Sequence, residues 1–273
     1  MARAAAALSV DDLAAALARL GVRPGDVLMV HASLRRIGPV DGRAAGVVAA
    51  IDRALGSKGT WMMTLGADDE WSWVNERPED ERPALLADAV PFDVLATPAD
   101  EDIGVLAEVF RTTPGTIVSD HPEGRMGARG RLAAAFTEHV PWDHYYGPGS
   151  PLDRFVEAGG RVLRLGADLD TVTLLHLAEY LVELPAKRQV RRHRMVSTAQ
   201  GPQLRVVECL DDSDGIVERD DPDAEDYFAS ITRDYLTTDR AALGAVGGAT
   251  AELLDGPDLV AFAVDWMGTH LAR

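Results

Sequence analysis

The chain has one cysteine and no apolar run long enough to span a bilayer. An internal disulfide is therefore excluded, and a reducing compartment is compatible with the composition. The first twenty residues are rich in alanine and leucine, but Asp11 and Asp12 interrupt them and the leucines recur at helical spacing. We therefore expect an amphipathic helix with Ser9 as its N-cap, not a targeting segment, and a cytoplasmic protein.

Two sequence motifs of nucleotide-binding proteins are missing. Neither G-x-G-x-x-G nor G-x-x-x-x-G-K-[ST] occurs, which argues against a Rossmann or P-loop site. No helical segment carries the pair of histidines typical of a zinc site, so we expect no metal.

Positive charge is scarce, with 27 Lys and Arg against 44 Asp and Glu and a net charge of −17. A field of that sign repels nucleic acid and anionic membranes, so neither is expected as a partner. Residues 68–102 hold twelve acids against two arginines, and residues 208–226 hold ten acids against one arginine. These two segments form either the walls of a cleft that concentrates polycations or plain solvated loops, and the sequence favours neither interpretation.

Apolar runs and glycine or proline breaks predict one α/β domain over residues 1–273. We expect a mixed, partly parallel central sheet with flanking helices and long acidic loops. The predicted strands are 27–31, 60–65, 116–118 and 161–165, with a hairpin over 190–207 that turns near residue 201. The predicted helices are 10–20, 42–56, 103–111, 130–138, 171–184, 222–236 and a C-terminal one, with loops at 32–39 and 66–102.

The segment from Asp170 to Glu179 carries the most chemical information. Asp170 is a predicted N-cap, and His176 and Glu179, three residues apart, share one face of the predicted helix with Thr173. An imidazole beside a carboxylate suits general-base catalysis. From spacing alone, a structural His–Glu pair on a half-buried helix is the favoured interpretation.

The loop from His31 to Gly38 leaves the carboxyl end of a predicted strand, where α/β sheets bind ligands. Its backbone amides, the Ser33 hydroxyl and two arginines could hold a phosphate-bearing chain. A polar loop with solvated arginines is the alternative.

Three further segments have weaker signals. The run Ser119–Pro122 could line a site or shape a turn, and the turn is slightly favoured. The glycines of Tyr145–Pro151 would let a ligand approach the backbone closely, or form an ordinary connection. The basic residues of 187–194 predict a solvated strand face, and Cys209 has no activating base beside it, which indicates a structural role.

Six segments, in this order, resemble the antibiotic 3-N-acetyltransferase family, which acetylates aminoglycosides and differs in fold from the GNAT acetyltransferases. They are GVRPGDVLMVHASLRRIG, PFDVLATPADEDIGVLAEVFR, SDHPEGRMGARG, YGPGSPLDRF, LGADLDTVTLLHLAEY and LVAFAVDWM. The resemblance covers nearly the whole chain. It implies transfer of an acetyl group from acetyl-CoA to an amine of an aminoglycoside, the 3-amino group of the 2-deoxystreptamine ring, by direct attack and without a metal.

The resemblance also implies a role for each site residue. His176 is similar to the catalytic base, Glu179 to its charge partner, and Thr173 to a hydroxyl near the thioester. Residues expected to bind acetyl-CoA are His31, Ala32, Ser33, Leu34, Arg35, Arg36, Ile37, Gly38, Ser119, His121 and Tyr146. Acids expected to face the cationic antibiotic are Asp68, Glu70, Asp170, Asp212 and Asp214.

The chain departs from the family pattern at Ala32, where a serine is frequent, and at Arg125, where a small hydroxyl residue is common. These departures leave open a biosynthetic N-acyltransferase acting on another amine. Two other classes remain as alternatives: a metal-assisted hydrolase using His31, His121 and His176, and a binding protein without catalysis. The sequence is compatible with a monomer or a homodimer.

Overall fold

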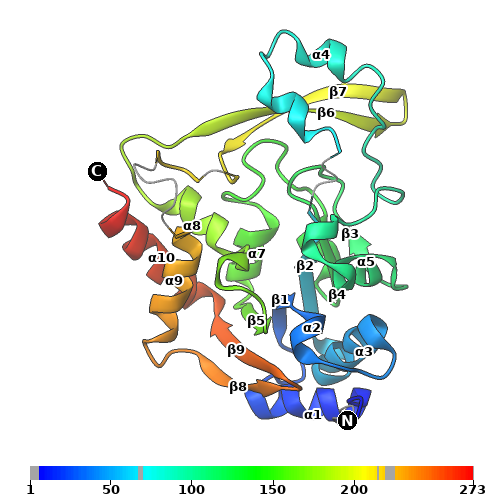
Figure 1. Ribbon diagram of the computed structural model, residues 1–273, viewed down its shortest axis with the longest axis vertical. Coiled ribbons are helices and arrows are strands. Elements are labelled where there is room, and N and C mark those ends of the chain that lie inside the picture. The colour runs from blue at the N-terminus through cyan, green and yellow to red at the C-terminus, as the bar shows by residue number, and fades with distance from the viewer. Residues whose placement is uncertain (1–5, 67–69, 214, 219–224, 273) are drawn as a thin grey trace, which may run out of the picture.

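A mixed seven-stranded sheet forms the centre of the computed structural model, which describes residues 6–66, 70–213, 215–218 and 225–272 (Figure 1). The strand order is β3-β4-β2-β1-β5-β9-β8. The strands are β1 (Val27–Ala32), β2 (Thr60–Thr64), β3 (Ile117–Val118), β4 (Met126–Gly130), β5 (Arg161–Leu165), β8 (Ala242–Val246) and β9 (Ala249–Asp255).

The three middle strands of this sheet are parallel and the outer ones are not. β1 pairs in parallel with β2 and with β5, whereas the pairs β2–β4, β3–β4, β5–β9 and β8–β9 are antiparallel. The expectation of a mixed, partly parallel sheet is confirmed. The carboxyl ends of β1, β2 and β5 consequently meet at one edge, which is where ligands bind in sheets of this kind.

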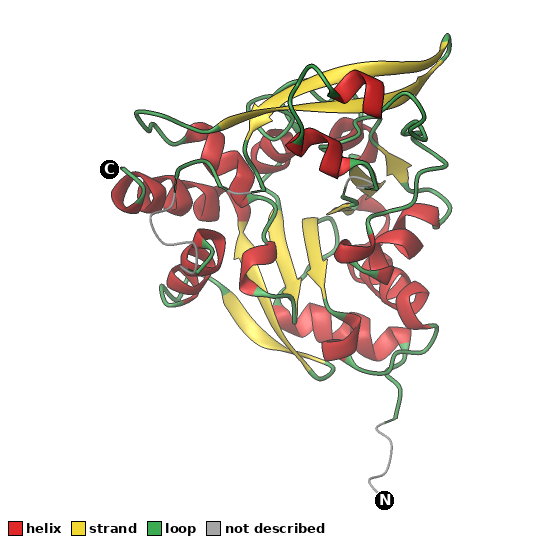
Figure 2. Ribbon diagram, turned by 45° about the horizontal axis from the view of Figure 1, so that its top comes forward, coloured by secondary structure: helices red, strands yellow, loops and turns green. Residues whose placement is uncertain are grey.

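Helices cover both faces of the sheet (Figure 2), and the middle strands are buried on both sides. In β1, Leu28 and Val30 pack into one apolar cluster while Met29, pointing the other way, packs into a second. The first cluster is completed by α1 (Val10–Leu20), α3 (Arg43–Leu55) and α5 (Val105–Thr112). The second is completed by α6 (Ala133–Thr137), α7 (Pro151–Glu157), α8 (Leu175–Leu181), α9 (Tyr227–Leu236) and α10 (Gly256–His270).

A two-stranded hairpin, β6 (Gln189–Thr198) and β7 (Gly201–Leu210), lies at the top of the molecule, apart from the central sheet (Figure 1). Residues 70–102, called the acidic segment below, pack against this hairpin. The backbone N–H of Phe92 donates to the carbonyl of Met195 at 2.8 Å, and the Phe92 carbonyl accepts from Ser197 N at 2.8 Å. Short helical turns interrupt the predicted loop 66–102. They are η2 (Ser72–Glu76), α4 (Arg82–Leu85) and η3 (Glu101–Ile103). A further turn, η1 (Gly56–Lys58), follows α3.

The N-terminal helix forms as the sequence predicts. Ser9 and Asp12 make a reciprocal capping box, and Gly21 ends α1 with a φ of 113°, a left-handed conformation that favours glycine. No helix in the described ranges is long and apolar enough to cross a membrane.

Several sequence-based expectations are wrong in detail. The predicted loop 32–39 contains a helical turn, α2 (Leu34–Ile37), and the predicted helix 171–184 is divided into η4 (Leu169–Thr171) and the shorter α8. The helix predicted over 130–138 begins three residues later, because β4 occupies the start of that range. Strands β4, β8 and β9 and the helix α7 were not predicted.

Candidate active site

A cavity of about 620 Å³ opens at the carboxyl ends of the parallel strands. Five segments form its wall: the end of β1 with the start of α2, the end of β2, the start of α5, the segment after β5, and α8 with α9. The lining residues from the predicted site are His31, Ala32, Ser33, Leu34, Arg35, Asp170, Thr173 and His176. The other major contributors are Met63, Thr64, Asp102, Val105, Leu106, Asp168 and Phe228. The topology thus brings together side chains from segments more than 140 positions apart in sequence.

His176 and Glu179 form a hydrogen-bonded pair at the wall of this large cavity. The Nδ1 atom of His176 lies 2.7 Å from Oε2 of Glu179, and both residues are on α8. The Glu179 side chain is only 2% exposed, whereas that of His176 is 17% exposed. Since Nδ1 is occupied by the carboxylate, Nε2 is the nitrogen left for a proton transfer.

Aromatic rings hold the His176 imidazole on two sides. Tyr146 stacks on it with ring centroids 4.9 Å apart and an interplanar angle of 10°, and Phe228 meets it edge-on at 4.8 Å. Tyr146 is buried and does not line the large cavity. The structure therefore places Tyr146 against the imidazole rather than in the channel where it was expected.

The pKa of His176 is raised above its ordinary value of 6.5. Burial opposes the charge on the ring, but the charge of Glu179 and its hydrogen bond outweigh burial, with Asp212 and Asp226 adding to the effect. The protonated imidazole that a base becomes is thus stabilised by its surroundings.

The structure corrects the placement of two residues near this pair. Thr173 does not share the helix of His176. It precedes α8 in a turn, and its carbonyl accepts from His176 N at 3.1 Å. Asp170 does not cap α8, whose N-cap is Leu174, but lies within η4. Because the chain turns twice in this segment, both side chains reach the cavity without helical spacing.

The loop after β1 divides into residues that face the large cavity and residues that do not. Arg35 faces it, whereas Arg36 donates to the Gly166 carbonyl and to Asp168, Ile37 is buried, and Gly38 has a φ of 92°. Arg36, Ile37 and Gly38 therefore do not line the large cavity, and their contacts with acetyl-CoA stay a prediction.

His31, at the end of β1, is buried, and burial together with the charge of Arg164 lowers its pKa to about 3. Its imidazole is neutral throughout the physiological range. The structure thus leaves His31 as a neutral polar group in the cavity wall.

Ser119 and His121 shape a turn and do not line the large cavity. Nδ1 of His121 accepts from the backbone N–H groups of Glu123 and Gly124, at 3.1 and 2.8 Å, and Nε2 donates to the carbonyl of Trp142 at 2.8 Å. The Ser119 hydroxyl accepts from Met126 N at 2.9 Å. The ring nitrogens of His121 and the hydroxyl of Ser119 thus have hydrogen-bond partners within the protein. This agrees with the prediction of a turn and argues against contact of these side chains with a ligand.

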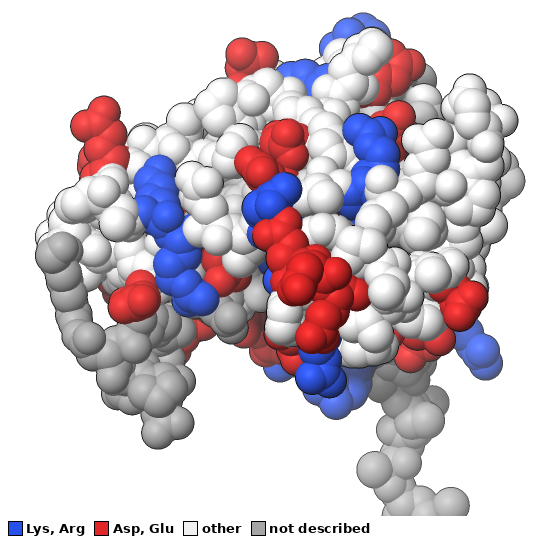
Figure 3. Space-filling model, turned by 90° about the horizontal axis from the view of Figure 1, so that it is seen from above, with Lys and Arg blue, Asp and Glu red and all other residues white. Residues whose placement is uncertain are grey.

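A second cavity, of about 600 Å³, lies between the hairpin and residues 72–82 of the acidic segment. Its acids are Glu76, Glu79, Glu123 and Asp211, and its bases are Arg82, Arg191, Arg192 and Arg194. On the face seen from above, carboxylates and basic side chains accordingly lie next to one another (Figure 3).

Of the arginines in the hairpin, Arg191 is exposed, as expected for a solvated strand face, whereas Arg192 and Arg194 are not. Arg192 bonds to Asp212 at 2.5 Å and to the Tyr145 hydroxyl at 2.9 Å, and Arg194 pairs with Glu123. These groups are largely buried because the acidic segment covers the hairpin. Lys187 instead donates to the carbonyls that end α8, those of Glu179 and Tyr180.

Asp212 connects the second cavity with the His176–Glu179 pair. Its carboxylate accepts from Arg192, which lines the second cavity, and its charge acts on His176, which lines the first. Burial opposes the charge of Asp212, but Arg192 outweighs it and holds the Asp212 pKa below its usual range.

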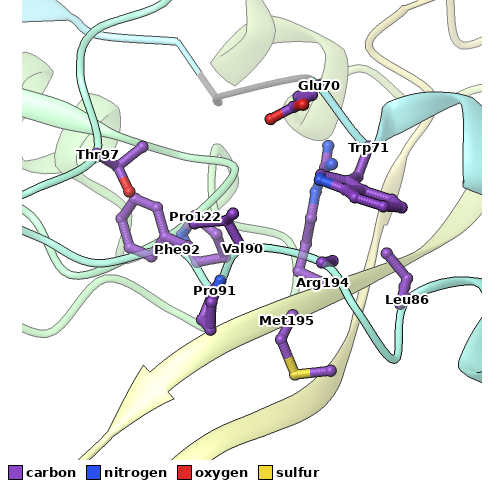
Figure 4. A pocket seen from close by; sticks show the side chains of 11 residues that line it. Glu70, Trp71, Leu86, Val90, Pro91, Phe92, Thr97, Pro122, Arg194 and Met195 are labelled. Carbon is purple, nitrogen blue, oxygen red and sulfur yellow. The ribbon is translucent and has the colours of Figure 1, made fainter.

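Glu70 lines neither large cavity. It lies beside a pocket of about 40 Å³ between the acidic segment and the hairpin, where Figure 4 shows the Arg194 side chain reaching toward Trp71 and Glu70. That volume suits about one water molecule, not an aminosugar. Asp68 and Asp214, the other acids expected to face the antibiotic, lie outside the described residues.

The histidines of the hydrolase alternative do not gather. Over the described part of the chain, no group of three or more His, Cys, Asp or Glu side chains is arranged to hold a metal ion. His31 and His176 line the large cavity, whereas His121 lies in the turn after β3.

Comparison with known proteins decides the family. Residues 29–268 match the sequence pattern of the aminoglycoside 3-N-acetyltransferase family. The chain belongs to that family. Aminoglycoside N(3)-acetyltransferase III of Serratia marcescens is 38% identical over 267 residues, covering 96% of this chain and 98% of the relative.

Solved structures of the aminoglycoside acetyltransferases share the fold. One, described as AAC-IIIb binary with CoASH, superposes with a TM-score of 0.91 at 38% identity and covers 98% of this chain and 99% of that one. Another, AAC-VIa with bound sisomicin, has a TM-score of 0.89 at 32% identity and covers 97% and 99%. The expected family, enzyme class and fold are confirmed.

Sequence reasoning missed several residues in the surroundings of the His176–Glu179 pair. Tyr227 donates to Glu179, and Arg192 bonds to Asp212. Neither has a sequence signal, because each meets its partner only through tertiary folding. Phe228 could be suspected only as an apolar residue of a helix.

Proposed function

We propose that this protein transfers the acetyl group of acetyl-CoA to the 3-amino group of the 2-deoxystreptamine ring of an aminoglycoside, with His176 as general base. The observation that carries the proposal is the His176–Glu179 pair, which presents a free Nε2 at the wall of a large cavity. The relatives that share the fold include one solved with CoASH and one with sisomicin.

The large cavity fits acetyl-CoA, the co-substrate. Helix α5 starts at Val105 behind Gly104, without a side chain that caps its first N–H groups, and Val105 and Leu106 lie in the cavity wall. Uncapped N–H groups at a helix start attract phosphate, and Arg35 lies on the same cavity. Apolar Met63 and Leu34 offer a surface for the uncharged part of the co-substrate.

The proton transfer follows from the geometry of the pair. An aminoglycoside ammonium cannot attack a thioester until it loses a proton, and Nε2 of His176 is the acceptor. As the imidazole gains charge, its Nδ1–H donates to Glu179, which stabilises the charged ring. The amine nitrogen then bonds to the thioester carbon, and the hydroxyl of Thr173, which lines the cavity near His176, is proposed to donate a hydrogen bond to the thioester oxygen as that oxygen gains negative charge. The bond between this carbon and the CoA sulfur breaks, and the CoA thiolate leaves. One of the two protons that the ammonium loses goes from His176 to the thiolate, and the other goes to solvent.

The second cavity is proposed to receive the aminoglycoside. The exposed carboxylates of Glu76 and Glu79 suit a polycation, whereas the buried ones of Glu123 and Asp211 already pair with arginines. Asp212 connects the cavity with His176 through its charge. Asp170, which lines the large cavity, is proposed to meet an ammonium group near the reacting amine.

Release of the CoA thiol from acetyl-CoA, measured with a panel of aminoglycosides, tests the proposal. We expect release that depends on the aminoglycoside and a product that carries one acetyl group on the 3-amino nitrogen, as located by two-dimensional NMR. Absence of release with 2-deoxystreptamine aminoglycosides, together with release by another amine, would assign the chain to a different acyl acceptor.

Arg35→Ala tests the placement of acetyl-CoA. If Arg35 meets a phosphate, its removal should raise KM for acetyl-CoA by about 10-fold, the effect of one lost charged hydrogen bond, and leave kcat nearly unchanged. Arg131→Ala removes an exposed arginine outside the cavity and serves as the control. Equal KM values for the two variants would place the phosphates elsewhere.

A further inference from the structure

We propose that Tyr227 is a positioning residue of the catalytic pair, whose hydroxyl fixes the Glu179 carboxylate in the orientation that serves His176. This inference rests on the proposed role of His176 as the base. It adds a third member to the pair, from a helix that lies about fifty positions further along the chain.

The contacts of Glu179 carry the inference. One carboxylate oxygen, Oε2, meets Nδ1 of His176 at 2.7 Å, and the other, Oε1, accepts from the hydroxyl of Tyr227. Glu179 is 1% exposed, so water does not replace a missing donor. Each oxygen thus has its own donor, and the carboxylate cannot rotate without breaking one of the two bonds.

The Tyr227 hydroxyl is itself held in place. It accepts from the backbone N–H of Ile216 at 3.4 Å, which directs its own proton toward Glu179. Its ring packs against Phe228, which in turn meets the imidazole of His176. The first turn of α9 therefore supplies both a donor to the carboxylate and a wall to the imidazole.

The other two carboxylates whose charge acts on His176, those of Asp212 and Asp226, have hydrogen-bond partners other than the Tyr227 hydroxyl. Asp212 follows β7 and is held by Arg192, and Asp226 is the N-cap of α9, bonded to Phe228 N. On the other side of Glu179, Lys187 bonds to backbone carbonyls and not to the carboxylate. Removing the hydroxyl changes the orientation of Glu179 and leaves these charges in place.

Tyr227→Phe is the test, since it removes the hydroxyl and keeps the ring. Without its second donor, Glu179 turns away from His176, and the imidazole loses the partner that offsets its burial. We expect kcat to fall by about 10- to 100-fold with KM values for both substrates within about two-fold. We also expect the acid limb of the kcat–pH profile to move to lower pH, because the pKa of His176 falls when Glu179 no longer faces it.

Tyr235→Phe is the matched control. Tyr235 lies on the same helix, is fully buried, and donates its hydroxyl to a carboxylate, Asp258, at 2.7 Å, but it does not contact the catalytic pair. Both variants should melt at similar temperatures, and Tyr235→Phe should keep the kcat and the acid limb of the unaltered protein.

An acid limb that stays in place in Tyr227→Phe, or moves to higher pH, overturns the proposal whatever happens to kcat. Titration of His176 by NMR gives the same readout without turnover. A lower pKa of His176 in Tyr227→Phe, in a protein that acetylates no aminoglycoside, would support the positioning role while the proposed function fails.

Discussion

Replacement of His176 by alanine should lower kcat by about 10²- to 10⁴-fold, the range in which a positioned general base contributes. The imidazole is the one titratable group of the pair that reaches the large cavity, since Glu179 is buried behind it. Thiol release from acetyl-CoA in the presence of an accepted aminoglycoside measures the loss.

Binding of CoA should survive the same substitution. The α5 start and Arg35 are proposed to hold the phosphates, and neither touches His176. Equilibrium titration with CoA should give a Kd within about three-fold of the Kd of the unaltered protein. That change is smaller than the loss of one charged hydrogen bond would cause. His270→Ala, which removes an exposed histidine near the end of α10, is the control for activity. A His176→Ala protein that turns over at more than a tenth of the normal rate would exclude this residue as the base.

Replacement of Arg125 by methionine should destabilise the protein by about 3 kcal/mol, the lower end of the cost of disrupting a buried charged network. The Arg125 side chain is fully buried and donates to the carbonyls of Val94, Thr97 and Pro98, while its guanidinium lies 5.3 Å from the centre of the Phe92 ring. Methionine fills much of the volume but leaves these carbonyls without their donor, and the bond to the Thr97 carbonyl is buried from water.

Chemical denaturation measures this effect, with Arg154→Met as the matched control. Arg154 also donates to backbone carbonyls, those of Glu138, His139 and Ser150, but its position is half-buried, so water can replace it. We expect less than about 1 kcal/mol for the control. Equal losses of unfolding free energy in the two variants would show that Arg125 does not anchor the segment 92–98.

The position of Arg125 also explains one departure from the family pattern. A small hydroxyl residue there could not reach the carbonyls of residues 94–98. In this chain the arginine ties the end of the acidic segment to the turn that precedes β4. The departure therefore concerns how the acidic segment is held, and the pair on α8 is unaffected by it.

The elements that the sequence predicts well are those whose pattern is local. The Ser9 N-cap of α1, the buried run of β1 and the hairpin turn each depend on neighbouring residues, and the structure confirms them. The His176–Glu179 contact belongs to the same class, because three residues of helix suffice to bring the two side chains together.

The strand β4 could not be predicted because its residues suit a loop better. It reads Met-Gly-Ala-Arg-Gly, and glycine is a poor strand former. The structure needs glycine at Gly127, where an added Cβ would lie 2.9 Å from the Phe110 ring, and at Gly130, where φ is 107°. Only the packing of α5 and β2 against this strand shows why an unfavourable sequence is extended.

The sequence also could not predict which acidic residues are buried against arginines and which are not. Asp212 and Glu70 belong to similar acidic runs, yet one is buried against Arg192 near His176 and the other lies beside a pocket the size of a water molecule. Composition predicts the net charge of a segment, whereas the pairing of each carboxylate depends on which arginine the fold brings to it.

The buried thiol of Cys209 has a practical consequence for the enzymology. Burial raises its pKa to about 12, and it is the chain's one cysteine. Disulfide reagents that turn coloured on meeting a thiolate therefore find no reactive sulfur on the folded protein. The colour in a continuous assay therefore reports the released CoA alone, with no background from the enzyme. A slow rise of absorbance in a sample without acetyl-CoA would signal unfolding of the protein.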